Sequence, residues 1–167
     1  RPLVDIEATD IDADDLAASI DDDPDRVRSD LESVFVRRTQ TLDSARGSQV
    51  ARRHASGGRT ARENVDDLCG ASFLEYGRLV VAAQEHRFET AELIERSQAD
   101  GVVAGIGAVN SELFTAPVSK CVIIAHDGTV FAGTQGRRGM AKIRRMLEVA
   151  EQGQLPVVVY AEGGGAR

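Results

Sequence analysis

The clearest pattern in this sequence is a pair of short, unbroken apolar runs in its last third. The chain reads CVIIA at 121–125 and PVVVY at 156–160. Unbroken runs of this length, rich in β-branched residues, are typical of buried strands. Between them, residues 140–152 repeat apolar side chains at helical intervals. The pattern predicts strand, helix and strand in that order, as in an α/β domain.

Two further strands are predicted before residue 120. One runs from Phe73 to Val81, and the other from Gly101 to Asn110. The second contains glycines at 101, 105 and 107, so we expect another part of the chain to approach its backbone closely. Residues 110–119, which include a proline, predict a hairpin loop that leads into the strand 120–125. A short helix or a mobile insert is expected at 89–96.

The first 69 residues show helical rather than strand patterns. Residues 1–23 alternate aspartates with small apolar residues and predict a weakly ordered acidic tail or linker. Pro24 suits the first turn of a helix, whose apolar positions recur at helical spacing until Gly57-Gly58 breaks it. Thr60 and Glu63 form a capping-box pattern that opens a short helix ending near residue 68. The predicted regions are therefore a tail at 1–23, a helical region at 24–69 and a strand-bearing region at 70–167.

Charge and composition restrict the class of protein. The formal charge of −7 is uneven, because residues 1–25 hold ten acids and one base while the rest carries 17 acids and 19 bases. An acidic tail on a nearly neutral body argues against nucleic acid as a partner. There is no apolar run long enough for a membrane span and no signal-peptide pattern, so we expect a cytoplasmic protein without a membrane partner. Cys69 and Cys121 lack metal-ligand spacing and are expected to be free thiols.

The candidate chemistry lies where the second apolar run enters three glycines, in AEGGGAR at 161–167. Adjacent glycines expose backbone N–H groups without side chains to shield them. Reactions that place negative charge on a carbonyl oxygen need such donors. On spacing alone, a plain turn or a frayed tail is the more economical interpretation of Gly163, Gly164 and Gly165.

Two other constellations are less specific. The glycine loop at 133–139 fits neither the G-x-G-x-x-G nor the Walker A pattern, which argues against nucleotide binding of those kinds. His126 and Asp127 suggest a catalytic dyad, but the sequence has no G-x-S-x-G nucleophile elbow. A structural histidine at the end of a buried strand is the favoured interpretation.

Several motifs, taken in order, resemble the carboxyltransferase part of biotin-dependent acyl-CoA carboxylases. The resemblance extends from about Arg46 to Arg167, and AEGGG at 161–165 is most similar to the carboxylases that act on longer acyl-CoAs. The segments that carry it are RHA at 53–55, RTARENV at 59–65, SFLEYG at 72–77, ADGVVAG at 99–105, HDGTVFAGT at 126–134, the helix through Lys142, LPV at 155–157 and GGGAR at 163–167.

The resemblance implies a crotonase-like ββα spiral, preceded by N-terminal helices and present here as an incomplete domain. It implies biotin, as carboxybiotin on a carrier domain, and acyl-CoA as substrate. No metal is expected in this chain, because two cysteines cannot form the four-cysteine zinc ribbon of some carboxyltransferases. The implied partners are biotin carboxylase and biotin carrier modules, the C-terminal half of the carboxyltransferase, and further copies of the chain in a homo-oligomer.

The implied activity moves the carboxyl group from carboxybiotin to the α-carbon of an acyl-CoA. The family's oxyanion-hole glycines map to Gly164 and Gly165, and Gly163 replaces the family's common serine beside the substrate. Arg138, Lys142 and Arg145 fall on one helical face, which is either solvated or holds the phosphates of coenzyme A. Two alternatives to the carboxylase remain, an acyl-CoA decarboxylase of the same family and a non-catalytic assembly domain. Because the resemblance covers only the first part of a carboxyltransferase, the isolated chain is expected to be inactive.

Overall fold

The computed structural model describes residues 28–167, and residues 34–167 form one compact unit. The predicted acidic tail at 1–23 and the helix start at Pro24 lie outside the described residues. None of the helices described is long and apolar enough to span a membrane. The elements are α2 (Ser29–Gln40), α3 (Gly47–Ala55), α4 (Ala61–Cys69), β1 (Leu74–Tyr76), α5 (Thr90–Arg96), β2 (Val102–Ala108), α6 (Ala116–Ser119), β3 (Lys120–His126), α7 (Arg137–Gly153) and β4 (Val157–Tyr160).

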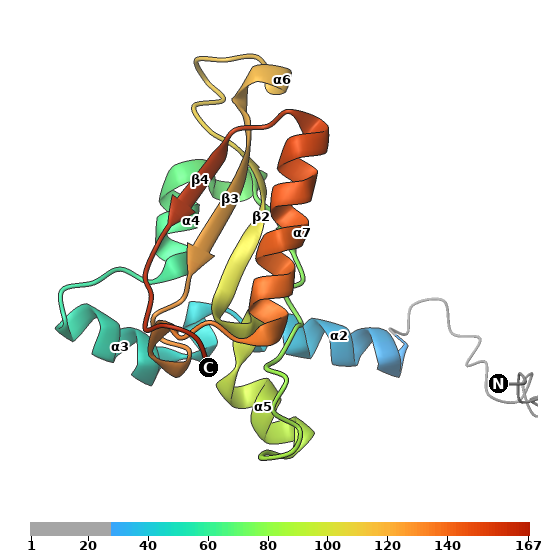
Figure 1. The fold of residues 1–167 in the computed structure, drawn as a ribbon, viewed down its shortest axis with the longest axis vertical. Coiled ribbons are helices and arrows are strands. Elements are labelled where there is room, and N and C mark those ends of the chain that lie inside the picture. Colours follow the sequence, from blue (N-terminus) through green and yellow to red (C-terminus); the bar gives the residue numbers. More distant parts are fainter. Residues whose placement is uncertain (1–27) are drawn as a thin grey trace, which may run out of the picture. The chain divides into compact units, whose positions relative to one another are not determined.

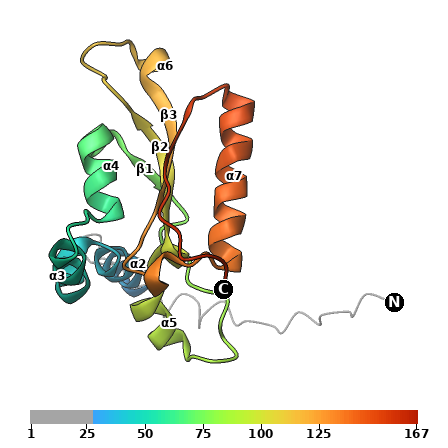
Figure 2. The ribbon, with the colours of Figure 1, turned by 60° about the vertical axis from the view of Figure 1, so that its left-hand side comes forward.

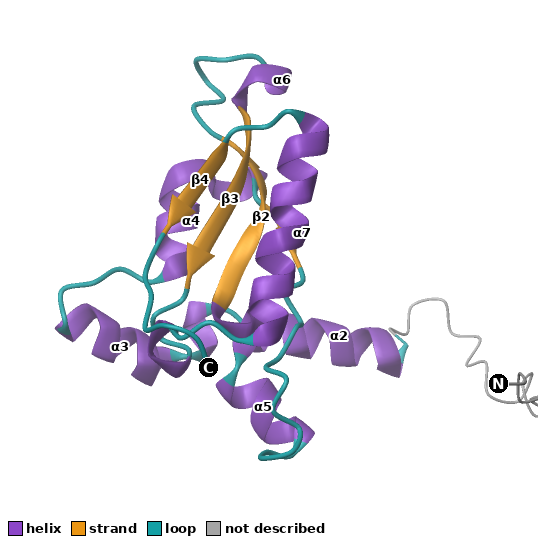
Figure 3. Ribbon diagram, viewed as in Figure 1, coloured by secondary structure: helices purple, strands orange, loops and turns teal. Residues whose placement is uncertain are grey.

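A four-stranded mixed sheet organises residues 74–160 (Figure 3). Its order is β1-β2-β3-β4, with the first three strands antiparallel and β4 parallel to β3. Ile123 pairs with Gly105 of β2 on one side and with Val158 of β4 on the other. The predicted strands at 121–125 and 156–160 and the helix between them are confirmed, and β2, β3 and α7 form a ββα unit that β4 follows.

The two faces of the sheet pack against different helices. On one face, Val102, Ala104, Val122 and Ile124 form a core with Met146 and Ala150 of α7. On the other face, Val103, Ile123 and Ala125 pack against Ala61 and Val65 of α4. Because side chains alternate along a strand, β2 and β3 bury both faces, which explains their continuous apolar sequence. Figures 1 and 2 show α4 and α7 on opposite sides of the strands.

The glycines of β2 allow a close approach to its backbone, as predicted. A Cβ added at Gly105 would lie 2.1 Å from the carbonyl oxygen of Leu74, and one at Gly107 would lie 2.7 Å from Sγ of Cys69. These distances are shorter than van der Waals contact, so a side chain at either position would push β1 or α4 away from the sheet.

Local signals at the start of α4 are confirmed. The Thr60 hydroxyl accepts the N–H of Glu63 at 3.0 Å, and the Glu63 carboxylate accepts the N–H of Thr60 at 2.8 Å. The hydrogen bond from the backbone N–H of Thr60 is the main reason why the pKa of the Glu63 carboxyl is lowered. The helix ends at Gly70, which has a φ of +49°.

Two predicted boundaries were wrong. The expected strand at 73–81 is only Leu74–Tyr76, because the chain turns at Gly77, whose φ is +60°. The predicted long N-terminal helix is interrupted after Gln40. There the Thr41 carbonyl accepts a hydrogen bond from Arg62 Nε at 2.6 Å, whereas in a continuing helix it would accept one from a backbone N–H. The hairpin loop at 110–119 is confirmed, because it joins the antiparallel strands β2 and β3, and its last residues form the short helix α6.

Candidate functional site

The three glycines that follow β4 form a docked turn rather than a frayed end. The N–H of Gln135 donates to the carbonyl of Gly165 at 2.8 Å, and the N–H of Arg167 donates to the carbonyl of Gln135 at 3.0 Å. These bonds make a parallel bridge between Gln135 and Ala166. The φ of Gly165 is +89°, a conformation that L side chains rarely adopt. We call residues 163–165 the glycine turn.

The two predicted donors of the glycine turn differ in their surroundings. The N–H of Gly164 donates to the carbonyl of Gly133 at 3.2 Å, and its Cα faces the carbonyl oxygen of Ala132, which would lie 2.6 Å from an added Cβ. Within residues 28–167, the N–H of Gly165 has no hydrogen-bond acceptor. Apart from the adjacent residues of the chain, no atom lies within 4 Å of the Cβ position of Gly163 or Gly165. One donor is thus already engaged, while the other is exposed and open to a ligand.

Ion pairs hold the residues on both sides of the glycine turn, and sequence reasoning missed them. Glu162 pairs with Arg53 of α3, and both side chains are partly exposed. Arg167 pairs with Asp100, which is fully buried just before β2. The sequence offered one signal of these pairs, namely that charged residues, Glu162 and Arg167, lie near the two ends of the glycine run. Their partners, however, lie 109 and 67 positions away in the chain.

The three basic residues predicted on one face of α7 do not share one environment. Lys142 lies in the stripe of α7 that faces the sheet, together with Met146 and Ala150. Its ammonium donates to the carbonyls of Gly77, at 3.1 Å, and of Val102. Burial lowers the pKa of Lys142 to about 8. The expectation of a single solvent-facing basic stripe is therefore wrong for this residue.

Arg138 and Arg145 remain on the accessible side of α7. Arg138 pairs with Glu85, and Arg145 pairs with Glu148 at 3.2 Å; these side chains are between 42% and 62% exposed. Exposed pairs of this kind are weak, so either arginine could exchange its carboxylate for another anion.

Asp127 has a structural role in the loop that receives the glycine turn. Its carboxylate accepts Arg46 Nη1 at 2.9 Å and the N–H of Thr129 at 2.9 Å, and both charged side chains are about 5% exposed or less. The carboxylate is thus engaged in a buried pair. This agrees with a structural role for Asp127 rather than a catalytic one, whereas Nδ1 of His126 is buried and has no hydrogen-bond partner among the described residues.

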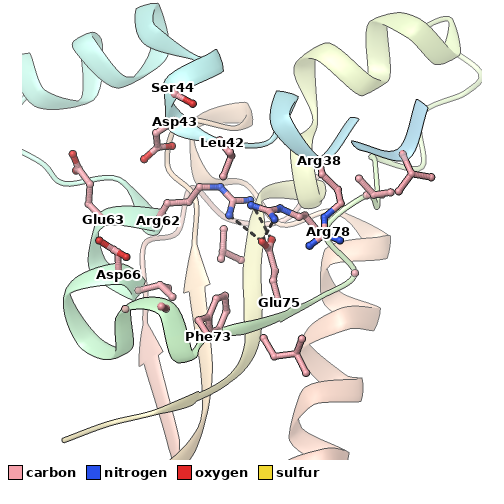
Figure 4. A pocket seen from close by; sticks show the side chains of 18 residues that line it. Arg38, Leu42, Asp43, Ser44, Arg62, Glu63, Asp66, Phe73, Glu75 and Arg78 are labelled. Carbon is pink, nitrogen blue, oxygen red and sulfur yellow. Dashed lines mark hydrogen bonds and ion pairs between the residues drawn. The ribbon is translucent and has the colours of Figure 1, made fainter. Parts of the chain in front are cut away.

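A cavity lies elsewhere, on the face of the sheet that carries α4 (Figure 4). Its volume is about 830 Å³, and Val65, Phe73 and Val103 form part of its apolar lining. The Glu75 carboxylate in this cavity accepts two hydrogen bonds from Arg62, at 2.9 and 3.1 Å, and pairs with Arg78. None of the predicted site residues lines it. Over the described residues, no cluster of three or more His, Cys, Asp or Glu side chains could hold a metal ion.

Comparisons with known proteins define the class. The carboxyl transferase domain family matches residues 52–167. The propionyl-CoA carboxylase beta chain of Saccharopolyspora erythraea is 29% identical over 140 residues, which are 82% of this chain and 23% of the relative. The biotin-dependent 3-methylcrotonyl-coenzyme A carboxylase beta1 subunit of Mycobacterium tuberculosis is 35% identical over 124 residues, 72% of this chain and 21% of that one.

Solved structures agree. A single-chain, multi-domain long-chain acyl-CoA carboxylase superposes with a TM-score of 0.82 at 47% identity, over 85% of this chain and 14% of that one. Transcarboxylase 12S shares the fold, with a TM-score of 0.66 at 24% identity, over 82% of this chain and 25% of that one. This chain belongs to the carboxyl transferase domain family of biotin-dependent acyl-CoA carboxylases. It spans less than a quarter of the curated relatives named above.

Proposed function

We propose that this chain supplies the acyl-CoA side of a carboxyltransferase site, with the glycine turn as an oxyanion hole. The observation that carries the proposal is the exposed N–H of Gly165, which is held by a docked backbone and has no acceptor within residues 28–167. A thioester oxygen that gains negative charge as the α-proton leaves is a suitable ligand for such a donor. The α-carbon would then bond to the transferred carboxyl carbon while the bond between that carbon and the biotin nitrogen breaks, and the freed biotin nitrogen would take up the α-proton.

Gly165 is the better of the two candidate donors in this geometry. Gly164 would have to give up its bond to the Gly133 carbonyl before it could bind a substrate oxygen. Gly163 carries no steric restriction, in agreement with a position that borders the substrate rather than shaping the turn. We therefore expect Gly165 to contribute more to transition-state stabilisation than Gly164.

The remaining components are proposed from the relatives. Biotin supplies the activated carboxyl group, and its carboxylase and carrier modules would lie in other chains or other parts of the same polypeptide. We propose that a second part of the carboxyltransferase completes the site, and that self-association occurs. Arg138 and Arg145 are proposed to attract the phosphates of coenzyme A, because both guanidinium groups are accessible and have only weak partners.

The test uses the intact carboxylase that contains this chain. Transfer of labelled carboxyl groups from carboxybiotin to acyl-CoAs of increasing chain length should show activity in the wild type. Gly165→Ala introduces a side chain at a φ of +89° and should lower kcat by roughly 10²–10³, the scale for losing one oxyanion donor. Gly163→Ala adds the same methyl group in open space and should change kcat only a few-fold.

ATP-dependent carboxylation of biotin is the control for folding and should be equal in both variants. Full transfer activity in the Gly165→Ala enzyme would show that the glycine turn is not the oxyanion hole. Absence of transfer to every acyl-CoA by the wild-type enzyme would remove the proposed activity itself.

A further inference from the structure

One buried carboxylate connects the glycine turn to the start of α7. Asp100 is 0% exposed and lies in the short 3-10 turn Gln98–Gly101 that precedes β2. Its Oδ2 accepts the backbone N–H of Gly139, in the first turn of α7, at 2.5 Å. Its Oδ1 accepts a hydrogen bond from Nη2 of Arg167, two residues beyond Gly165.

Arg167 is itself held on several sides. Its Nη1 donates to the carbonyl and, at 3.1 Å, to the hydroxyl of Thr134. Its guanidinium carbon lies 4.5 Å from the centre of the Phe131 ring, within the range of a cation–π contact. The planar guanidinium group can bind a carboxylate and a carbonyl in fixed directions at the same time, which a lysine ammonium cannot reproduce.

The local sequence leaves room for this pair. A Cβ at Gly136 would lie 2.7 Å from Oδ1 of Asp100 and 2.8 Å from Nη2 of Arg167. A Cβ at Gly139 would lie 2.8 Å from the Asp100 carbonyl oxygen. Both positions at the start of α7 therefore require the absence of a side chain for the Asp100–Arg167 contact to form.

We propose that Asp100 and Arg167 are positioning residues, which orient the N–H of Gly165 toward the substrate oxygen. This inference rests on the proposed function of the glycine turn. The backbone of Arg167 is bonded to Gln135, which in turn holds the carbonyl of Gly165. The buried pair thus fixes the peptide group that follows Gly165, and the N–H of Gly165 lies on the peptide group directly before it. Displacing a reacting group by about 1 Å can cost 10²-fold in rate, so small movements of this pair matter.

The pair on the other side of the glycine turn provides a contrast. The side chains of Arg53 and Glu162 are 24% and 34% exposed, whereas those of Arg167 and Asp100 are 12% and 0% exposed. Water can replace either partner of an exposed pair, but not of a buried one. The buried pair should thus dominate the orientation of the turn.

The experiment compares Arg167→Lys and Gly136→Ala in the intact carboxylase with Arg59→Lys as matched control. Arg59 pairs with Asp67 at 3.1 Å, and both side chains are more than half exposed. We expect kcat to fall 10- to 100-fold in the first two variants, with the KM for acyl-CoA within threefold, because the donor acts in the transition state. Amide hydrogen exchange at Gln135 and Arg167 should accelerate in both, and the control should match the wild type.

Two readouts separate this inference from the proposed function. Unchanged exchange and unchanged kcat in both variants would overturn the positioning role, even if Gly165→Ala is inactive. Faster exchange without loss of kcat would support the positioning of the turn and refute its catalytic use. Gly136→Ala removes no atom of the pair but forces its two charged groups apart, so it tests the proposal if the Arg167→Lys enzyme fails to fold.

Discussion

The buried ion pair between Arg46 and Asp127 permits a quantitative prediction about the loop that receives the glycine turn. Arg46 precedes α3, and Asp127 follows β3, so the pair joins the N-terminal helices to the sheet. The two side chains are 4% and 5% exposed and 2.9 Å apart. The perturbation is Arg46→Met, which keeps much of the side-chain volume and removes the charge.

The expected cost follows from the burial of Asp127. Without Arg46, its carboxylate keeps only the hydrogen bonds from Thr129. Removing one partner of a buried pair generally costs about 3–5 kcal/mol, because the other charge stays buried and uncompensated. Since about 1.4 kcal/mol corresponds to a factor of ten, local opening should become roughly 10²- to 4 × 10³-fold more frequent.

Hydrogen exchange of the intact enzyme, read by mass spectrometry, measures this opening. The N–H of Val130 donates to the Asp127 carbonyl at 3.1 Å, so peptides across 127–133 should exchange faster by that factor. Arg59→Met removes one partner of an exposed pair and should change exchange by no more than the equivalent of about 1 kcal/mol.

A double variant tests the physical cause. Arg46→Met combined with Asp127→Leu removes both charges and should recover much of the lost protection, because no unpaired carboxylate remains. If Arg46→Met accelerates exchange no more than Arg59→Met does, the reasoning from burial is refuted. If the double variant is worse than Arg46→Met alone, the contribution of Asp127 comes from its bonds to the loop rather than from its charge.

Two further predictions concern α7. The pKa of Lys142 is lowered to about 8 from 10.5, chiefly by burial, so the folded state releases its proton at lower pH than the unfolded state. The contribution of Lys142 to stability should be constant below pH 8 and rise between pH 8 and 10.5, by roughly 3 kcal/mol in all. The difference in urea midpoint between the wild type and Lys142→Met should show this rise. Arg145→Glu should raise the KM for acyl-CoA at low salt and much less at high salt, because an exposed charge acts through a screened field. An unchanged KM would show that Arg145 only contacts solvent and does not bind coenzyme A.

The helices and strands of this protein were predicted best where a local pattern of apolar residues is enough to determine the secondary structure. The apolar runs at 121–125 and 156–160 are buried strands, and the segment between them is a helix, because burial on both faces of a sheet leaves no polar alternation. Thr60 and Glu63 specified the start of α4 through bonds that span three residues. The order of the motifs was sufficient to identify the family.

The same reasoning failed where the outcome depends on contacts between distant segments. Helical spacing placed Lys142 with Arg138 and Arg145, but it cannot tell which side of a helix a sheet will cover. The stripe through Met146 lies against β2 and β3, and Lys142 is one position in that stripe. Its buried ammonium is tolerated because two backbone carbonyls face it.

In the glycine turn, too, some features follow from the sequence and others only from contacts between distant segments. Three successive glycines in the sequence indicate exposed backbone donors, and the structure indeed leaves the N–H of Gly165 without a partner among the described residues. Only the tertiary structure brings Gly133 to the N–H of Gly164, and Asp100 to Arg167 across 67 positions. Hydrogen bonds and ion pairs form where the folded chain brings donors and acceptors together. The sequence alone therefore determined the kind of group in the glycine turn. The packing of the 3-10 turn Gln98–Gly101, the loop before α7 and α7 itself decided whether Gly164 or Gly165 keeps a free donor.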